Sequence, residues 1–281
     1  MGKSIMITSF KGGVGKSTVA VNLAVGLAVR QYRVLIIDLD TSSGSVDLFM
    51  GCENDTIYNF CDVAEKKVNI QEAVYVKKGE VRVMTEKGKW VNIPYSLDVL
   101  KAPPSYDMAV PLEKAIGEFL EEAKETYDYI IFDCPSGKFS LFEILSQKTD
   151  IVFVVTLHSA ASIRSAENLA ISLSEQGSRG ENVRLIINCF NSRGVMRGLN
   201  LGIVEIIERS KIKLIGLIAI NNLIRDYQEL GKTVYDFRNV RIRKYFDDII
   251  GRILDNNINL ANKYDGIKTN ALYFKKGPKN D

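Results

Sequence analysis

Short apolar runs alternate with longer stretches of helical periodicity along most of this chain. The apolar runs are nearly continuous in Val, Ile and Phe, which is typical of strands that are covered on both faces. Strands are expected at residues 4–8, 33–38, 97–102, 129–133, 151–157, 183–188 and 213–218. Helices are expected at residues 17–29, 111–126, 161–175, 199–209 and 242–254. The alternation predicts an α/β fold, a doubly wound and mainly parallel sheet with helices on both faces.

Two segments interrupt this alternation. Residues 76–99 contain several turn signals built on Gly and Pro, and they predict a hairpin or a loop insertion. Residues 257–281 are polar, and their few apolar residues cluster just before Gly277 and Pro278, so a C-terminal tail is expected there. The chain has 281 residues, of which 46% are hydrophobic, and this is within the range of one α/β domain, expected at residues 1–256.

The most specific pattern is a glycine-rich loop between the first expected strand and the first expected helix. It reads Phe10-Lys-Gly-Gly-Val-Gly-Lys-Ser-Thr18. The glycines allow successive backbone N–H groups to converge on one centre, and the following helix adds the positive end of its dipole. A plain turn between strand and helix would not explain the Gly-Lys-Ser ending, so a phosphate-binding loop is expected. The nucleotide-binding residues would be Gly12, Gly13, Val14, Gly15, Lys16, Ser17 and Thr18.

Three side chains of this loop have distinct expected roles. Lys16 would reach the β- and γ-phosphate oxygens of ATP as a catalytic residue. The Ser17 hydroxyl would take one position on Mg²⁺, and Thr18 would bond the α-phosphate.

Lys11 restricts the class of phosphate-binding loop further, because an ordinary loop of this kind needs no lysine before its glycines. The run Lys-Gly-Gly-Val-Gly-Lys-Ser-Thr resembles the deviant Walker A motif of the MinD/ParA family of ATPases, which have the P-loop NTPase fold. In that family the extra lysine reaches the nucleotide of the partner subunit in a sandwich dimer. The resemblance implies that Lys11 is catalytic across a homodimer interface. The alternative is a solvated surface lysine.

A second segment carries the same resemblance. Asp38-Leu-Asp40 follows the second expected strand and resembles the family's switch I, and Asp47-Leu-Phe-Met-Gly51 reproduces a run of the MinD branch. A carboxylate can orient an attacking water, so Asp40 is the candidate for positioning the nucleophile. Asp38 would support Mg²⁺ or the switch. Both aspartates could instead cap local turns.

A third segment, Asp133-Cys-Pro-Ser-Gly137, follows an apolar strand and resembles a Walker B and switch II pattern. Asp133 would hold a Mg²⁺-bound water, and Gly137 could offer a backbone N–H to the γ-phosphate. Ser136 stands where the family more often has Ala or Pro, a departure that is not expected to alter the chemistry. Asn188 ends a later strand and would contact the adenine edge, unless it is only a strand-end turn residue.

Composition excludes several other functions. The net charge is only +3 and the basic residues are scattered, so nucleic acid is not indicated as a partner. The four cysteines form no C-x-x-C pair, which argues against an iron–sulfur reductase and favours reduced thiols, with Cys134 as a buried filler. His158, the one histidine, is expected to be structural or exposed.

No apolar run approaches the roughly 20 residues that a membrane-spanning helix needs. The N-terminus leads directly into the first strand without a signal-peptide pattern. The expected location is therefore cytoplasmic, at most peripheral to the membrane. An ordinary tail is expected at residues 257–281, with weak membrane attachment as the alternative.

Together the three segments imply an ATP-hydrolysing switch of the MinD/ParA type that uses ATP/ADP and Mg²⁺. It would be a homodimer in the ATP state and would position a division site, a pilus or flagellum, or another cargo. A protein activator or cargo adaptor is the expected partner, because slow turnover calls for one. The alternative is a nucleotide-dependent scaffold with little hydrolysis.

Overall fold

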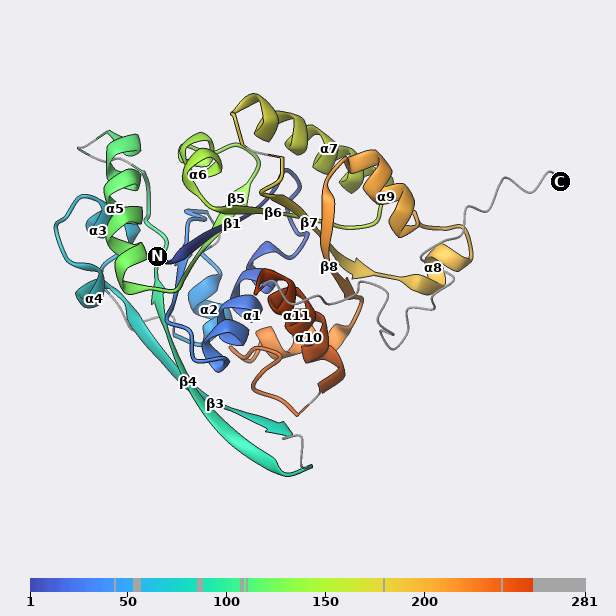
Figure 1. Ribbon diagram of the computed structural model, residues 1–281, viewed down its shortest axis with the longest axis horizontal. Helices are drawn as coiled ribbons and strands as arrows, with labels where there is room; N and C mark the ends of the chain where they lie inside the picture. The colour runs from blue at the N-terminus through green and yellow to red at the C-terminus, as the bar shows by residue number, and fades with distance from the viewer. Residues whose placement is uncertain are drawn as a thin grey trace.

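Within the residues that the computed structural model describes, eight strands form one sheet (Figure 1). These residues are 1–42, 44–52, 57–84, 88–106, 109, 111–178, 180–238 and 240–254. The strands lie in the order β3-β4-β2-β5-β1-β6-β7-β8, and only β3 and β4 are antiparallel to each other. Their bounds are β1 Lys3–Ser9, β2 Val34–Asp38, β3 Tyr75–Met84, β4 Trp90–Leu100, β5 Tyr129–Ser136, β6 Ile151–Thr156, β7 Val183–Phe190 and β8 Lys213–Ala219.

Helices cover both faces of the sheet, as Figure 1 shows. One face carries α1 (Lys16–Val29), α2 (Val46–Met50), α10 (Asn222–Gln228) and α11 (Val240–Ile253). The other carries α5 (Leu112–Thr126), α6 (Phe142–Lys148), α7 (Ala160–Glu175) and α9 (Ile203–Ser210). Beside α5 lie α3 (Phe60–Ala64) and α4 (Ile70–Ala73), and α8 (Ser192–Met196) follows β7. The predicted doubly wound, mainly parallel α/β fold is confirmed.

The core explains why the central strands are so apolar. Residues Ile5 to Ile7 of β1 and Ile130 to Phe132 of β5 are completely buried, because helices cover them from both sides. Helix α1 is apolar almost all round, since it lies between the sheet and α11. This buried helix begins at the phosphate-binding loop and therefore holds the loop on a rigid support.

Residues 75–100 differ in detail from the expected pattern. The sequence predicts a separate strand at 97–102, but residues 97–100 are the end of β4, which pairs with β3 from Trp90 to Val99 as an antiparallel hairpin. The paired residues extend from Tyr75 with Val99 to Met84 with Trp90. The apolar end of β4 lies beside β2 within the sheet, and this explains why only that end has a buried-strand pattern.

Short helices are the elements that periodicity does not reveal. Four of them, α3, α4, α8 and α10, begin after an asparagine whose side chain accepts a backbone N–H of the first turn. These caps are Asn59, Asn69, Asn191 and Asn221. The local hydrogen bond stabilises a helix that is too short for a repeating apolar face.

None of the helices in the described ranges is both long and apolar enough to cross a membrane. The tail expected at residues 257–281 lies outside the described residues.

Candidate functional site

A cavity of about 420 Å³ lies beyond the carboxyl ends of the central strands, where ligands of doubly wound sheets bind. It brings together the glycine-rich loop, the segment after β2 and the end of β5. Its lining residues are Gly12, Gly13, Gly15, Lys16, Ser17, Thr18, Asp40, Ser45, Phe49 and Ser136. Most of the residues predicted for phosphate binding therefore share one cavity with Asp40. Five predicted residues are not part of the lining: Lys11, Val14, Asp38, Asp133 and Asn188.

The loop takes its shape from glycines that no other residue could replace without strain. Gly13 and Gly15 have φ values of 70° and 91°, in the left-handed region. A Cβ atom on Gly15 would lie 2.2 Å from Asn188 Nδ2. The Asn188 amide donates to the Val14 carbonyl at 2.8 Å, and Val14 itself is buried. Asn188 thus supports the loop from β7, while its contact with adenine stays a prediction.

Lys16 is almost fully buried, with 8% of its surface exposed, yet its ammonium group points to the cavity. Its Nζ atom donates to Ser136 Oγ at 2.7 Å. Ser136 lines the same cavity, although no role in the site was predicted for it from the sequence. Its hydroxyl connects the end of β5 directly to Lys16.

Asp38, the last residue of β2, and Asp40 are two positions apart, but their side chains make different contacts. Both oxygens of Asp38 accept backbone N–H groups, from Asp40 at 2.8 Å and from Val46 at 3.0 Å, so Asp38 holds the loop between β2 and α2. Burial raises the pKa of Asp38 to about 6, with a smaller effect from the charges of Asp40 and Asp47. Asp40 is half-buried, and its Oδ1 accepts from the hydroxyl and the N–H of Ser42. Asp40 is thus the carboxylate that the cavity exposes.

Asp133 is the most deeply buried acid of the site and pairs in register with Asp38 on the neighbouring strand. Neither of its oxygens has a hydrogen-bond partner among the described residues. Burial, followed by the charge of Asp38, raises the pKa of Asp133 well above its usual range, while the Ser17 hydroxyl and the Lys16 charge act in the opposite direction. Two adjacent buried carboxyls favour a positive charge close by.

These acceptors fit a hydrated Mg²⁺ ion. The described residues contain no cluster of three His, Cys, Asp or Glu side chains that could hold a metal ion alone. Mg²⁺ binds phosphates and keeps several waters, so it needs few protein ligands. Ser17 in the cavity would supply the direct ligand, and the unpaired oxygens of Asp133 are acceptors for a metal-bound water.

Lys11 is exposed and is not part of the cavity lining. Its Nζ lies 3.4 Å from the hydroxyl of Ser162, in the first turn of α7. The hydrogen bond is long, and Ser162 also bonds Ser159 at 2.9 Å, so Lys11 is weakly held. Its ammonium group is therefore free to rearrange.

Two residues outside the cavity, Cys134 and His158, can be compared with the predictions made for them from the sequence. Cys134 is buried, and burial raises the pKa of its thiol well above the usual range, as expected for a filler. His158 is buried, and its ring packs against that of Phe190, with 5.2 Å between the two ring centroids.

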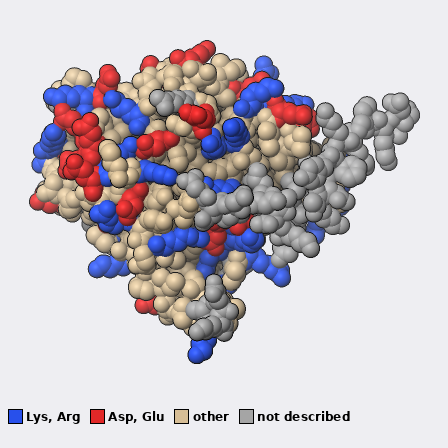
Figure 2. Space-filling view, viewed as in Figure 1, with Lys and Arg blue, Asp and Glu red and all other residues tan. Residues whose placement is uncertain are grey.

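Charges of both signs mix on the face shown in Figure 2, where Lys and Arg are interspersed with Asp and Glu. Neither sign dominates the part of that face that is coloured by charge.

Comparison with known proteins gives a consistent result. Residues 2–183 match the model of a family described as an AAA domain. The chain is similar to the septum site-determining protein MinD of Thermotoga maritima, with 30% identity over 264 residues, 94% of this chain and 92% of the relative. It is also similar to a chain of the MinC:MinD cell division protein complex of Aquifex aeolicus. That chain has a TM-score of 0.76 and 28% identity, with coverage of 93% of this chain and 99% of that one. The MinD of Pyrococcus horikoshii OT3, solved with Mg-ADP, shares the fold, with a TM-score of 0.68 and 22% identity, over 90% of this chain and 96% of that one.

Proposed function

Because this chain belongs to the MinD/ParA family of P-loop ATPases, we propose that ATP holds two copies of it together and that hydrolysis releases them. The chain is an ATPase that uses ATP and Mg²⁺. The observation that best supports the switch is the cavity in which the phosphate-binding loop, Asp40 and Ser136 converge. Three segments that respond to one phosphate group can change position together when it leaves.

Each residue of the cavity has a role in this proposal. Lys16 neutralises charge on the β- and γ-phosphates, Thr18 bonds the α-phosphate, and the glycines at 12, 13 and 15 present backbone N–H groups. Mg²⁺ bound through Ser17 would neutralise charge on the phosphates. Asp40 orients the attacking water and accepts its proton late in the reaction. Asp38 keeps Asp40 in place through its backbone bond.

Ser136 adds a switch contact to this scheme. Its hydroxyl accepts from Lys16 at 2.7 Å, and its own proton stays available to donate to a phosphate oxygen. Because the ammonium group has three N–H donors, Lys16 can bond Ser136 and the phosphates together. The end of β5 would then follow the nucleotide state.

Lys11 would complete the site of the partner copy. It lies outside the cavity of its own chain and is held only by a long bond to Ser162. Terminal phosphates between two such lysines supply interface contacts that ADP lacks. The dimer is therefore expected with ATP and not with ADP.

The relatives suggest what the switch serves. MinD proteins are septum site-determining proteins, and that of Aquifex aeolicus forms a complex with MinC. We extend this to a positioning role for the present chain, in which a protein activator or adaptor binds the ATP dimer. The proposed domain is residues 1–256, acting in the cytoplasm or at the membrane surface, and the 257–281 tail is left outside it.

The test measures assembly. Asp40→Ala protein with ATP and Mg²⁺ should elute as a dimer in size-exclusion chromatography with light scattering, since hydrolysis no longer dissolves it. Adding Lys11→Ala should return it to a monomer, whereas adding Lys213→Ala, an exposed lysine at the start of β8, should not. A dimer that is indifferent to nucleotide and to Lys11 would refute the switch. An ATP dimer whose parent shows no hydrolysis, even with a partner, would favour a scaffold.

A further inference from the structure

Helix α1 carries a row of residues that face the C-terminal part of the chain. Thr18, Asn22, Gly26 and Arg30 are spaced by four residues, and such positions lie on neighbouring parts of one helix face. Asn22 and Gly26 are buried within an otherwise apolar helix. The row starts at the cavity, because Thr18 is part of its lining.

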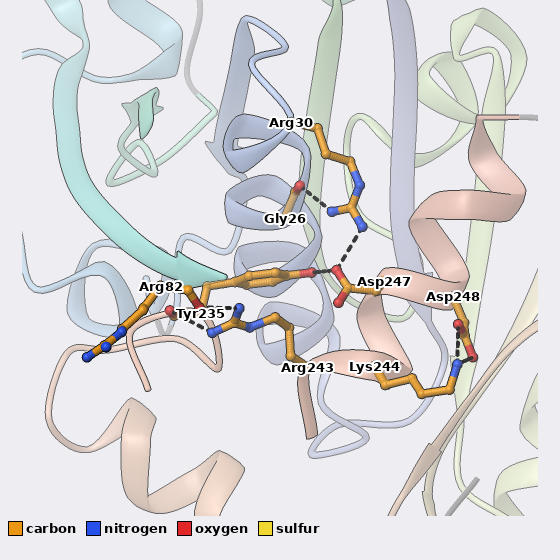
Figure 3. A network of polar contacts seen from close by, with 8 residues as sticks. All are labelled: Gly26, Arg30, Arg82, Tyr235, Arg243, Lys244, Asp247 and Asp248. Atoms are coloured by element: carbon orange, nitrogen blue, oxygen red, sulfur yellow. Dashed lines mark hydrogen bonds and ion pairs between the residues drawn. The ribbon is translucent and has the colours of Figure 1, made fainter. Parts of the chain in front are cut away.

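Each residue of this row contacts the segment from α10 to α11. Asn22 Oδ1 accepts the N–H of Val234 at 2.9 Å, and a Cβ on Gly26 would lie 2.3 Å from the Tyr235 hydroxyl. At the far end, shown in Figure 3, Arg30 and the Tyr235 hydroxyl both donate to Asp247 Oδ1, at 2.8 and 2.9 Å. The segment is thus fastened to the helix that follows the phosphate-binding loop.

At the cavity end, the partner of Thr18 is Gln228, the last residue of α10. The Thr18 hydroxyl donates to Gln228 Oε1 at 3.1 Å. Gln228 is 6% exposed, and its Nε2 has no hydrogen-bond partner among the described residues. The Asn22 amide, one turn further along α1, is paired at both atoms, with Thr18 O and with Val234 N. A buried amide donor without a partner is costly and requires an explanation.

The bond between Thr18 and Gln228 also conflicts with the proposed role of Thr18. A hydroxyl has one proton, so Thr18 cannot donate to Gln228 and to a phosphate at once. An amide can resolve this, because half a turn about its last bond exchanges Oε1 and Nε2. Nε2 then donates to Thr18 Oγ1, and the Thr18 proton becomes available to the phosphate.

We propose that Gln228 is a positioning residue for the nucleotide, whose amide oxygen accepts a hydrogen bond from the Thr18 hydroxyl in one orientation and whose amide nitrogen donates one to that hydroxyl in the other. This inference rests on the proposed function, since it requires a nucleotide α-phosphate at Thr18. The unpaired Nε2 is then the donor that the second orientation uses. The same residue lies close to switch I, because Gly231 donates to its carbonyl and packs directly on Gly51, which follows α2.

The experiment separates this role from a purely structural one. Gln228→Met keeps the length of the side chain but removes the amide. ADP and ATP should both bind roughly tenfold more weakly by isothermal titration, and by the same factor, because the α-phosphate is common to both. The midpoint of thermal unfolding without nucleotide should stay equal or rise, since an unpaired buried donor is removed. A structural amide would instead lower that midpoint.

Two controls complete the test. Gln176→Met changes a half-buried glutamine that follows α7 on the opposite face of the sheet, and it should leave nucleotide affinity unchanged. In a Thr18→Val background, Gln228→Met should have no further effect on affinity, because the hydroxyl that it serves is absent.

Equal affinity of parent and Gln228→Met, or additive losses with Thr18→Val, overturns the role of Gln228 and leaves the proposed function standing. So does a lowered unfolding midpoint that accompanies weaker binding. A parent that binds neither ADP nor ATP overturns both.

Discussion

At the scale of single residues, the site keeps groups where the folded chain alone does not satisfy them. Asp133 has two unpaired oxygens, and burial raises its pKa and that of Asp38. Lys16 is buried but bonded only to a serine hydroxyl in the described structure. Buried charged groups of this kind are costly in an ordinary core and are typical of sites that bind a charged ligand.

Substitutions at Lys16 and Asp40 should affect ATP binding and ATP hydrolysis separately. Lys16→Ala should abolish ATP binding, because the phosphates lose their main side-chain charge. Asp40→Ala should keep ATP affinity and slow hydrolysis by roughly 100-fold or more, as expected for loss of a general base. Titration with ATP and release of phosphate in single-turnover reactions measure the two effects. An Asp40→Ala protein that hydrolyses ATP at the parent rate would exclude Asp40 from water positioning.

His158 should make stability depend on pH. Burial lowers its pKa below the usual value, so the unfolded chain takes up a proton first as the pH falls. The neutral His158 ring contributes to the free energy of unfolding above the pKa that the histidine has in the unfolded chain. This contribution is lost as the pH falls below that value. Between about pH 7.5 and 5.5 the parent should therefore lose more stability to urea than His158→Leu does. Parallel pH profiles of the two proteins would show that the pKa of His158 is the same in the folded and unfolded chain, which contradicts this prediction.

At the scale of secondary-structure elements, a feature could be predicted from the sequence when the interactions that form it are between residues close together in the chain. The central strands could be read from the sequence because both of their faces are buried, and the phosphate-binding loop because its glycines and lysines act locally. The hydrogen bond of Asn188 to Val14 and that of Gln228 to Thr18 join residues far apart in the chain. No local pattern carries that information, so their contacts could only be seen in the fold.

Two helical glycines should respond in opposite directions to alanine. In α1, a Cβ on Gly26 would lie 2.3 Å from both Tyr235 Oη and Ile250 Cδ1. Overpacking costs about 1–3 kcal/mol, which exceeds the gain in helix propensity of about 1 kcal/mol. Gly26→Ala should therefore destabilise the protein in urea unfolding.

Gly117 in α5 is the matched control. A Cβ there meets nothing closer than Lys148 Nζ at 3.7 Å, so Gly117→Ala should gain about 0.5–1 kcal/mol. Stabilisation by both substitutions would mean that α1 and the Tyr235 segment are not tightly packed.

At the scale of the whole molecule, residues 257–281 bear on whether the proposed ATP dimer attaches to a membrane. Membrane attachment needs apolar area on one helix face as well as basic charge. Residues 257–281 contain five lysines, of which Lys275, Lys276 and Lys279 lie near the end of the segment. Each lysine is worth ~1 kcal/mol near an anionic surface, and such charges are largely screened at physiological salt. Any helix formed by the apolar residues before Gly277 would end at Gly277 and Pro278, because proline cannot continue a helix.

We therefore expect little sedimentation of the ATP-bound protein with anionic liposomes at ~0.15 M salt. The comparison is the same protein without residues 257–281. Strong ATP-dependent co-sedimentation that this deletion removes would place the chain with membrane-cycling proteins.

The position of β1 in the sheet has a consequence for the newly made chain. β1 leaves the ribosome first, yet its neighbours in the sheet are β5 and β6, which are made much later. The phosphate-binding loop that follows β1 therefore has no fixed position until Thr156 has been synthesised, and Gln228 reaches Thr18 later still. Long-range parallel pairing of this kind forms slowly. ATP can therefore stabilise the completed polypeptide, whereas a nascent or truncated one has not yet formed the site that binds it.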